Sequence, residues 1–212
     1  MRPHRETVRL TKGQVLYDAG DAIRHLYFPM GGMISLLSTT RDGASIEVGM
    51  IGNEGVAGLA VLLGINRAPY RVIVQIPGNA IRVRADALKK VFDRGGRLHD
   101  LLLKYTHTLL IQIAQSAACN RFHTVEERLC RWLLISRDRV YSDTIYLTQE
   151  FLSYMLGVPR TSVTAVAGKL QRAGLIRYSR GKIQITDRPR MEAASCECYD
   201  IIREDIRLFL AA

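Results

Sequence analysis

Long apolar runs are missing from this 212-residue chain. The opening residues Met1–Glu6 are charged and lead into no stretch long enough for a secretion signal or a membrane-spanning helix. We therefore expect no membrane association and a cytoplasmic protein. The composition, 48% hydrophobic and 24% charged, is ordinary for a globular protein and suffices for one large core or two modest ones.

Cysteine is absent before Cys119, and the spacings of the four cysteines match neither a zinc ribbon nor a disulfide framework. The sequence therefore predicts reduced thiols, no bound metal and no cofactor. Cys119 and Cys130 would lie about 16 Å apart along an unbroken helix, too far for a disulfide. Two redox hypotheses stay open: a bond between Cys119 and its mate in a dimer, and a thiol pair at Cys196 and Cys198 in a helix expected over residues 190–210.

Paired histidines are also missing, which bears on metal enzymes built on small barrels. Such enzymes bind an ion through two or three histidines and a carboxylate, commonly with a His-x-His pair. In residues 1–95 only His4 and His25 are present, and they are not paired. A cupin-type metal enzyme would lack its ligands here, and no enzymatic activity is expected.

Acidic residues are absent from residues 151–186, although this segment holds six basic ones. A solvated surface helix normally interleaves both signs, so charge of one sign indicates a negative partner. The formal net charge of +10 and the pI near 9.8 favour the same interpretation, with a nucleic acid backbone as the usual polyanion. The six residues are Arg160, Lys169, Arg172, Arg177, Arg180 and Lys182.

Turn signals such as Asp42-Gly43 recur about every ten residues between Leu10 and Val83. Short strands at this spacing are typical of a closed antiparallel barrel or jelly roll. The small and apolar stretch 56–64 interrupts the rhythm and predicts one short helix ending at a glycine. The expected strands are 14–17, 25–29, 33–39, 45–50 and 71–76.

Residues 98–120 contain neither proline nor glycine and carry apolar side chains all round, which predicts a long helix buried on more than one side. One ladder of residues alternates steps of four and three, the seam spacing of a helix pair. It indicates a dimer seam, with packing on the chain's own barrel as the alternative, and His107 within it is interpreted as a register-setting polar residue. The ladder is Leu103, His107, Leu110, Ala114 and Ala117.

A second helix is predicted from about Thr124. The sequence Thr124-Val125-Glu126-Glu127 matches a capping box, in which the threonine hydroxyl and the second glutamate satisfy each other's backbone amides. The residues between the two helices, 121–123, are a candidate hinge.

The segment after Leu147 matches a helix-turn-helix. Thr148 can cap a helix that stops at Gly157, and Pro159 suits the first turn of a second helix over 159–173. Residues 174–185 then match a hairpin with a basic tip, the wing of a winged helix.

In helix-turn-helix proteins the N-terminal part of the second helix meets base edges. Arg160 could pair with guanine O6 and N7, while Thr161, Ser162 and Thr164 reach bases or phosphates. Lys169 suits phosphate contact. The full set of candidate DNA-binding residues is Thr148, Arg160, Thr161, Ser162, Thr164, Lys169, Arg180 and Lys182.

With these elements in place, the chain resembles the CRP/FNR family of bacterial transcription regulators over nearly its full length. The resemblance implies a cyclic-nucleotide-binding-like β-roll, a long dimerisation helix and a winged helix that binds a two-fold symmetric site in double-stranded DNA, with RNA polymerase as a further candidate partner. The matching segments are Lys12-Gly13-Gln14 through Gly20-Asp21, the Asp42-Gly43 turn, 125–129, and 147–181.

The family's cyclic AMP pocket, as the resemblance implies, uses a Gly-Glu pair that contacts the ribose and an Arg-Ser pair that contacts the phosphate. The matching region here has Val56 at the glutamate position and Ala68-Pro69 at the Arg-Ser position, while an alignment shifted by one residue would use Arg67. Cyclic AMP binding is therefore not expected, and the effector is unknown. The candidate pocket residues are Val56, Ala57, Gly58, Arg67, Ala68 and Tyr70.

Two further departures concern the signal and the operator. Oxygen-sensing members of the family hold an iron–sulfur cluster on an N-terminal cysteine group, which is absent before Cys119. Arg160 matches the family's base-reading arginine, but Thr161 stands where a glutamate is common and Ala165 where a second arginine can stand. We therefore expect a different operator sequence, since each bidentate contact is worth roughly 1–3 kcal/mol of discrimination.

The sequence thus predicts an α+β protein with an N-terminal antiparallel β-roll, a long helix and a C-terminal winged helix-turn-helix. We expect a sensor domain over 1–95, a dimerisation helix and hinge over 96–123, a DNA-binding domain over 124–188 and a helical extension over 189–212. The predicted function is a homodimeric DNA-binding transcription regulator that does not respond to cyclic AMP. Two alternatives stay open: a regulator of the same architecture that responds to a cyclic nucleotide or to thiol redox state, and a small-molecule-binding barrel protein or enzyme whose winged helix contacts protein.

Overall fold

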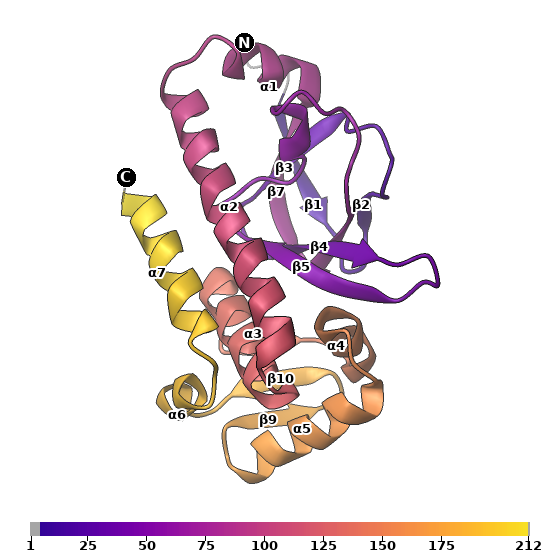
Figure 1. The fold of residues 1–212 in the computed structure, drawn as a ribbon, viewed down its shortest axis with the longest axis vertical. Helices are drawn as coiled ribbons and strands as arrows, with labels where there is room; N and C mark the ends of the chain where they lie inside the picture. Colours follow the sequence, from indigo (N-terminus) through magenta and orange to yellow (C-terminus); the bar gives the residue numbers. More distant parts are fainter. Residues whose placement is uncertain (1–4, 212) are drawn as a thin grey trace.

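The first half of the chain forms a roll of short antiparallel strands in the computed structural model, which describes residues 5–211 (Figure 1). The strand orders of its two sheets are β1-β7-β3 and β2-β6-β4-β5. Leu26, Ile34, Val74 and Ala80 are fully buried in the core of the roll. His4 lies outside the described residues. The strands are β1 (Arg5–Leu10), β2 (Val15–Tyr17), β3 (His25–Pro29), β4 (Met33–Thr39), β5 (Ser45–Ile51), β6 (Arg71–Ile76) and β7 (Gly78–Arg84).

Strands β2 to β6 confirm the five strands expected from the sequence, and β1 and β7 are additional. Neither additional strand shows the apolar alternation of a half-buried strand. In β1 only Leu10 is buried, and in β7 only Ala80 is. Their pairing with each other, over six residue pairs from Arg5–Val83 to Leu10–Gly78, is what makes them strands.

The helix expected over 56–64 is shorter in the structure, where only η1 (Leu59–Val61) is helical, as a 3₁₀ turn. Gly58, with a φ of 97°, prevents an earlier start, and Gly64, with a φ of 86°, follows its end. Both angles lie in the left-handed region that favours glycine. The turn lies in the connection between β5 and β6.

Three helices follow the roll: α1 (Ala85–Phe92), α2 (Arg97–Phe122) and α3 (Val125–Val140). Helix α1 is not predicted by the sequence analysis, whereas α2 and α3 are. Thr124 and Glu127 form both hydrogen bonds of the predicted capping box. His123 is extended, with φ −107° and ψ 148°, and separates α2 from α3. Helix α2 runs along one side of the β-roll (Figure 1).

The helix-turn-helix consists of α4 (Gln149–Leu156) and α5 (Arg160–Arg172), and the wing of β9 (Ile176–Ser179) and β10 (Lys182–Ile185). The expected hairpin is present, and β8 (Thr144–Tyr146) pairs with β10 as a third strand that the sequence did not predict. A three-residue strand carries too little pattern to be recognised. Helix α5 lies at the opposite end of the molecule from α1 (Figure 1).

The prediction of a single helix over 190–210 is wrong. The chain forms two helices there, α6 (Arg188–Ala193) and α7 (Cys198–Ala211), with a break between them. At the break, the Ser195 hydroxyl donates to the Glu192 carbonyl at 2.8 Å, a local bond that competes with continued helix. Helix α7 then packs on α2, where the rings of Tyr105 and Phe209 lie 5.9 Å apart.

The β-roll and the C-terminal half of the chain share a core. Met33, Leu37 and Met50 of the roll belong to the same buried cluster as Trp132 and Leu152. Strand β5 also contacts α4 directly. Within residues 5–211, no helix has the length and apolarity needed to cross a bilayer.

Candidate nucleic-acid interface

Helix α4 is fixed at both ends by local sequence. The Thr148 hydroxyl accepts a hydrogen bond from the Phe151 amide at 3.2 Å, which caps the helix start. Gly157 adopts φ 60° and ψ 40°, and the Val158 amide donates back to the Ser153 carbonyl at 3.1 Å. This left-handed glycine ends α4 and sets the turn into α5.

Helix α5 separates a buried stripe from an exposed one. Val163, Ala167 and Leu170 are buried, which holds the helix against the core of the domain. On the other side Ser162 is half-buried, and the exposed residues are Arg160, Thr161, Thr164, Ala165 and Lys169. The Thr164 hydroxyl donates to Gln149 Oε1 of α4 at 2.7 Å, so the two helices are joined across the exposed side.

A hollow of about 370 Å³ lies between the start of α4, the start of α5 and the wing. Arg160 and Arg180 reach it from α5 and from the wing, and Thr148 reaches it from the cap of α4. Glu150 is its one acidic lining residue among the described residues. Two guanidinium groups beside a helix N-terminus are suited to an anion such as a phosphate group.

The wing turns tightly at Arg180 and Gly181, which both have positive φ, at 49° and 76°. Positive φ at both central residues is typical of the two-residue turn whose twist matches a hairpin. The turn brings Arg180 to the tip, and Lys182 follows as an exposed residue at the start of β10.

Lys169 is the exception to the one-signed charge. Its Nζ forms an ion pair with Glu126 of α3, which lies outside the segment 151–186. Sequence analysis could not find this counter-charge because the two residues are 43 positions apart. Since the Lys169 side chain is 64% exposed, its ammonium can still exchange this partner for another anion.

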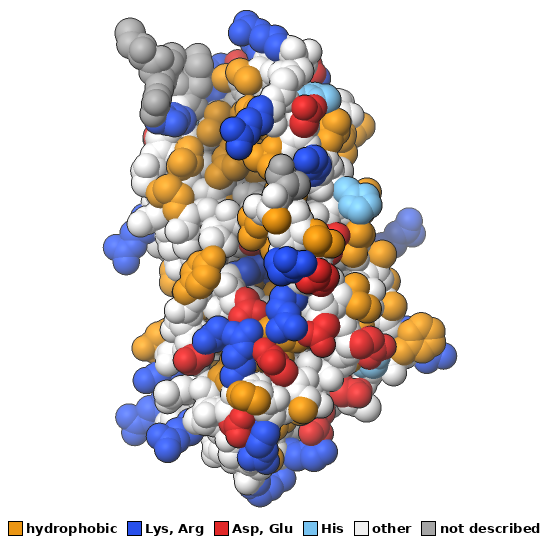
Figure 2. Space-filling view, turned by 90° about the vertical axis from the view of Figure 1, so that its left-hand side faces the viewer, with side chains coloured by type: hydrophobic (Ala, Val, Ile, Leu, Met, Phe, Trp, Pro, Cys, Tyr) orange, Lys and Arg blue, Asp and Glu red, His pale blue; other side chains and the backbone are white. Residues whose placement is uncertain are grey.

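On the side of the molecule that carries α6 and α7, basic and acidic side chains are paired with each other. Figure 2 shows blue and red side chains mixed in the lower half of this face. Arg188 pairs with Asp138 at 2.9 Å and with Glu192 at 2.8 Å, and Arg203 pairs with Asp200 at 2.7 Å. Arg160, Arg180 and Lys182 differ from these arginines, because within residues 5–211 they form no ion pair with a carboxylate.

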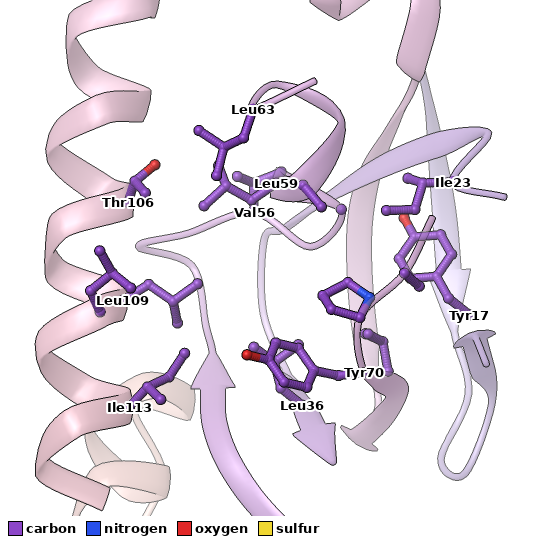
Figure 3. A pocket seen from close by; sticks show the side chains of 16 residues that line it. Tyr17, Ile23, Leu36, Val56, Leu59, Leu63, Tyr70, Thr106, Leu109 and Ile113 are labelled. Atoms are coloured by element: carbon purple, nitrogen blue, oxygen red, sulfur yellow. The ribbon is translucent and has the colours of Figure 1, made fainter. Parts of the chain in front are cut away.

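A second candidate site is an apolar cavity of about 210 Å³ between the β-roll and α2 (Figure 3). Four of the candidate pocket residues line it: Val56, Gly58, Ala68 and Tyr70. Ala57 is fully buried beside it, where its backbone pairs with Tyr27. Arg67 does not line it, because its Nη1 donates to the Gly20 carbonyl at 2.7 Å.

The remaining cavity lining comes from η1, the strands and α2. In Figure 3 Thr106, Leu109 and Ile113 face the roll from α2, opposite Leu36 and Tyr70. Its polar groups include the Tyr17 hydroxyl, which donates to the His25 carbonyl and whose pKa is raised by burial. No lysine, arginine or histidine of the described chain lines this cavity.

The cysteines form a third cluster, which the sequence spacing did not predict. Cys119 Sγ and Cys196 Sγ lie 3.5 Å apart, and Cys198 Sγ lies 3.5 Å from His123 Nδ1. The hydrogen bond between the two thiols lowers the pKa of Cys119 to about 5 and, together with burial, raises the pKa of Cys196. Cys130 is outside the cluster, where burial raises its pKa to about 12.

This arrangement bears on the two redox hypotheses left open by the sequence. Cys119 is fully buried and faces Cys196 of its own chain, so a bond to a mate in a dimer is not available in this conformation. Cys196 and Cys198 do not form an isolated pair, because both contact residues of α2 or the residue that follows it. His123, which the sequence analysis treated only as a hinge residue, is the member of the cluster that spacing could not reveal.

Comparison with known proteins agrees with this architecture. The chain matches the model of the cyclic nucleotide-binding domain over residues 7–94 and that of the Crp-like helix-turn-helix domain over residues 127–194. No curated protein sequence matches it.

Solved structures share the fold at low identity. FixK2 from Bradyrhizobium japonicum is 16% identical with a TM-score of 0.77, and the alignment covers 91% of this chain and 98% of that one. TTHB099, a CRP-family transcriptional regulator from Thermus thermophilus, is 18% identical with a TM-score of 0.73, over 89% and 96% of the two chains. The c-di-GMP-responsive regulator CLP from Xanthomonas campestris is 16% identical with a TM-score of 0.71, over 87% and 95%.

A β-roll joined through a long helix to a winged helix-turn-helix defines a class of DNA-binding regulators. With both of its domains matched and the whole architecture shared, the chain belongs to the CRP/FNR family of transcription regulators.

Proposed function

We propose that the protein is a homodimer that binds a two-fold symmetric DNA site through α5 and the wing, and that cyclic AMP does not control it. The observation that carries the proposal is the exposed start of α5, flanked by the wing arginine, in a segment free of acidic residues from 151 to 186. The working parts are a sensor domain (1–95), a dimerisation helix and hinge (96–123), a reader (124–188) and a helical extension (189–212).

Within the reader, Arg160 pairs with a guanine edge, and Thr161, Ser162 and Thr164 contact neighbouring bases or phosphates. Thr148, Lys169, Arg180 and Lys182 hold the DNA backbone. The presence of Arg160 and Arg180 around one hollow supports this division, since a phosphate seated there would orient α5 in the groove.

The dimer is supported by the exposed stripe on α2. All five ladder residues are exposed in the single chain, including Leu103 at 43% and Leu110 at 61%. The alternative, packing of the ladder on the chain's own roll, is not favoured, because Leu102, Tyr105 and Leu109 make that contact instead. Two exposed leucines repeated along one helix face are typical of a self-complementary interface.

The apolar cavity argues against cyclic AMP. A cyclic nucleotide carries a phosphate anion, and burying an anion without a counter-charge or several hydrogen bonds is costly. The described lining offers apolar side chains and hydroxyl groups, and Arg67 points to the Gly20 carbonyl instead. An effector in this cavity would be uncharged and largely apolar.

The DNA proposal is tested by selecting a preferred site from random double-stranded DNA with the full chain. Arg160→Ala should weaken binding to the selected site roughly 10- to 100-fold, the equivalent of about 1–3 kcal/mol, and change binding to random DNA little. Arg172→Ala, at an exposed arginine in the last turn of the same helix, is the control and should keep the discrimination. Unchanged affinity in an Arg160→Ala/Lys182→Ala variant would favour the rival in which the winged helix contacts protein.

The effector proposal is tested by calorimetric titration of the full chain with cyclic AMP and with cyclic GMP. No binding heat is expected at micromolar nucleotide concentrations. Clear micromolar binding of either nucleotide would overturn this part of the proposal and leave the DNA part standing.

A further inference from the structure

Four side chains from two distant parts of the chain converge at the base of α2. Cys119 and His123 come from the end of that helix and the residue after it, and Cys196 and Cys198 come from the break between α6 and α7 and the start of α7. One ligand atom from each residue lies within 4.8 Å of all the others. We propose that these four residues bind a single divalent metal ion, Zn²⁺, as a structural site that fixes the hinge of the regulator.

The spacing of the ligand atoms fits one tetrahedral ion. Zn–S bonds of about 2.3 Å in a tetrahedron separate the ligand atoms by about 3.8 Å. Cys119 Sγ to Cys196 Sγ and Cys198 Sγ to His123 Nδ1 are both 3.5 Å. An iron–sulfur cluster places several iron and sulfide atoms between its cysteines and needs a wider cage. Three thiolates and one imidazole are a common structural zinc set.

Residues around the four candidate ligands form hydrogen bonds of the kind that orient metal ligands. His123 turns Nδ1 toward Cys198, and its other ring nitrogen, Nε2, lies 3.2 Å from Glu197 Oε2. A carboxylate on the far nitrogen fixes the tautomer and the orientation of a metal-binding ring. Gln115 Nε2 also donates to Cys198 Sγ at 3.1 Å, as an amide donor does to a thiolate.

The charge balance around the cluster supports the same ion. Zn²⁺ with three thiolates and a neutral imidazole carries a net charge of about −1. Arg128 and Arg131 of α3 are buried, and both interact electrostatically with the cluster through Cys119. Within residues 5–211 the Nε and Nη1 of Arg131 have no hydrogen-bond partner. A buried guanidinium needs an anion nearby, and the zinc-thiolate group supplies one in addition to the Glu47 carboxyl on which Arg131 also acts.

The position of the site gives it a consequence beyond local stability. It ties the end of α2 to the segment that carries α7, beside the extended residue that precedes α3. A bound ion therefore favours one arrangement of α2, α3 and α7, and through α3 one position of the reader. The site also explains why a chain with a CxC motif folds it back onto a helix 77 residues earlier.

The test is the metal content of the full chain purified without a metal-binding tag and under reducing conditions. About one zinc ion per chain is expected by elemental mass spectrometry, and Co²⁺ substitution should give the thiolate charge-transfer and strong d–d absorption of a tetrahedral site. Cys196→Ser and Cys198→Ser should lose the ion. Cys130→Ser is the matched control, because Cys130 is equally buried but outside the cluster, and it should keep the full equivalent.

A surface variant guards against misfolding as the cause of metal loss. Glu197 is exposed, and Glu197→Gln should leave the fold intact while weakening zinc affinity about 10- to 100-fold in a competition with a chromophoric chelator. Added zinc should raise the unfolding temperature of the metal-free wild type and of Cys130→Ser, but not that of Cys196→Ser. A metal-free wild type with a Cys119–Cys196 disulfide, or one that holds iron with acid-labile sulfide, would overturn the proposal. These readouts need no DNA, so they stand or fall separately from the proposed DNA binding.

Discussion

Glu47 is a carboxyl group placed where the β-roll meets α3. It is 7% exposed, and its Oε1 accepts a hydrogen bond from Trp132 Nε1 at 2.9 Å. Its Oε2 has no hydrogen-bond partner in the described part of the chain. Burial raises the pKa of Glu47 to about 7, against the opposing effect of hydrogen bonds and of Arg131 and Arg139. We therefore expect Glu47 to make the stability of this contact dependent on pH.

Glu47→Gln tests this dependence. Because the folded carboxyl has the higher pKa, the folded state binds more protons than the unfolded state between pH 4.5 and 7, and the free energy of unfolding falls as the pH rises through that window. A shift of this size corresponds to about 3 kcal/mol at most. Denaturant unfolding from about pH 4.5 to about pH 8 should therefore show wild type losing stability relative to Glu47→Gln. Parallel curves for the two proteins would contradict the raised pKa.

At the scale of one element, helix α2 presents three different surfaces: one against the roll, one exposed, and one in the thiol cluster. Leu102, Tyr105 and Leu109 cover the roll, the ladder through Leu103 and Leu110 stays exposed, and the last turn contributes Cys119 to the thiol cluster. This division explains why the helix is apolar all round. The unpartnered leucines are the part that a second copy would cover.

Introducing negative charge on the exposed ladder of α2 should dissociate the proposed dimer. Leu103→Glu/Leu110→Glu is expected to sediment as a monomer and to lose high-affinity binding to a two-fold operator, because like charges would meet across the seam. The control is Leu101→Glu, since Leu101 is also 43% exposed but lies on a different face of α2. A dimer that persists in the double variant, or one that Leu101→Glu also separates, would place the interface elsewhere.

At the scale of the whole molecule, the helix-turn-helix domain is packed against the β-roll rather than tethered to it. Trp132 donates to Glu47 across the boundary, and Met33 and Met50 share a core with α3 and α4. Gly157 makes a close approach, since a Cβ there would lie 2.8 Å from Ile46 Cδ1 of β5. The position of the helix-turn-helix is therefore constrained by the roll, and in the proposed regulator this contact would be a direct route from the sensor domain to the DNA-binding domain.

Two glycine substitutions separate backbone strain from this contact. Gly157→Ala and Gly174→Ala both place alanine at positive φ, which costs about 1–2 kcal/mol, but only Gly157 has a neighbour within contact distance of the added methyl group. Gly157→Ala should therefore lower the free energy of unfolding more than Gly174→Ala does. Ile46→Ala should recover part of the difference in a double-mutant cycle, and additive effects would argue against the contact.

Short sequence motifs predicted much of the architecture. The capping box at Thr124, the glycine turn at Gly157 and the basic hairpin tip each act within a few residues, so the sequence predicts them and the structure contains them. The loss of the pocket carboxylate at Val56 could also be read directly, because the resemblance supplies the position. The one-signed charge and the helix-turn-helix spacing together predicted DNA binding, and the resemblance of segments along nearly the whole chain predicted the family.

Tertiary structure decided what depends on residues far apart in the chain. The pairing of β1 with β7, the ion pair of Lys169 with Glu126 and the buried Glu47 leave no local pattern. The thiol cluster is the clearest case, because its four residues fall in two groups with no motif spacing between them, and only the packing of α7 on α2 brings them together. By itself the sequence determined which local elements form and what charge they carry. The fold alone determined which distant side chains meet, since that depends on how those elements pack.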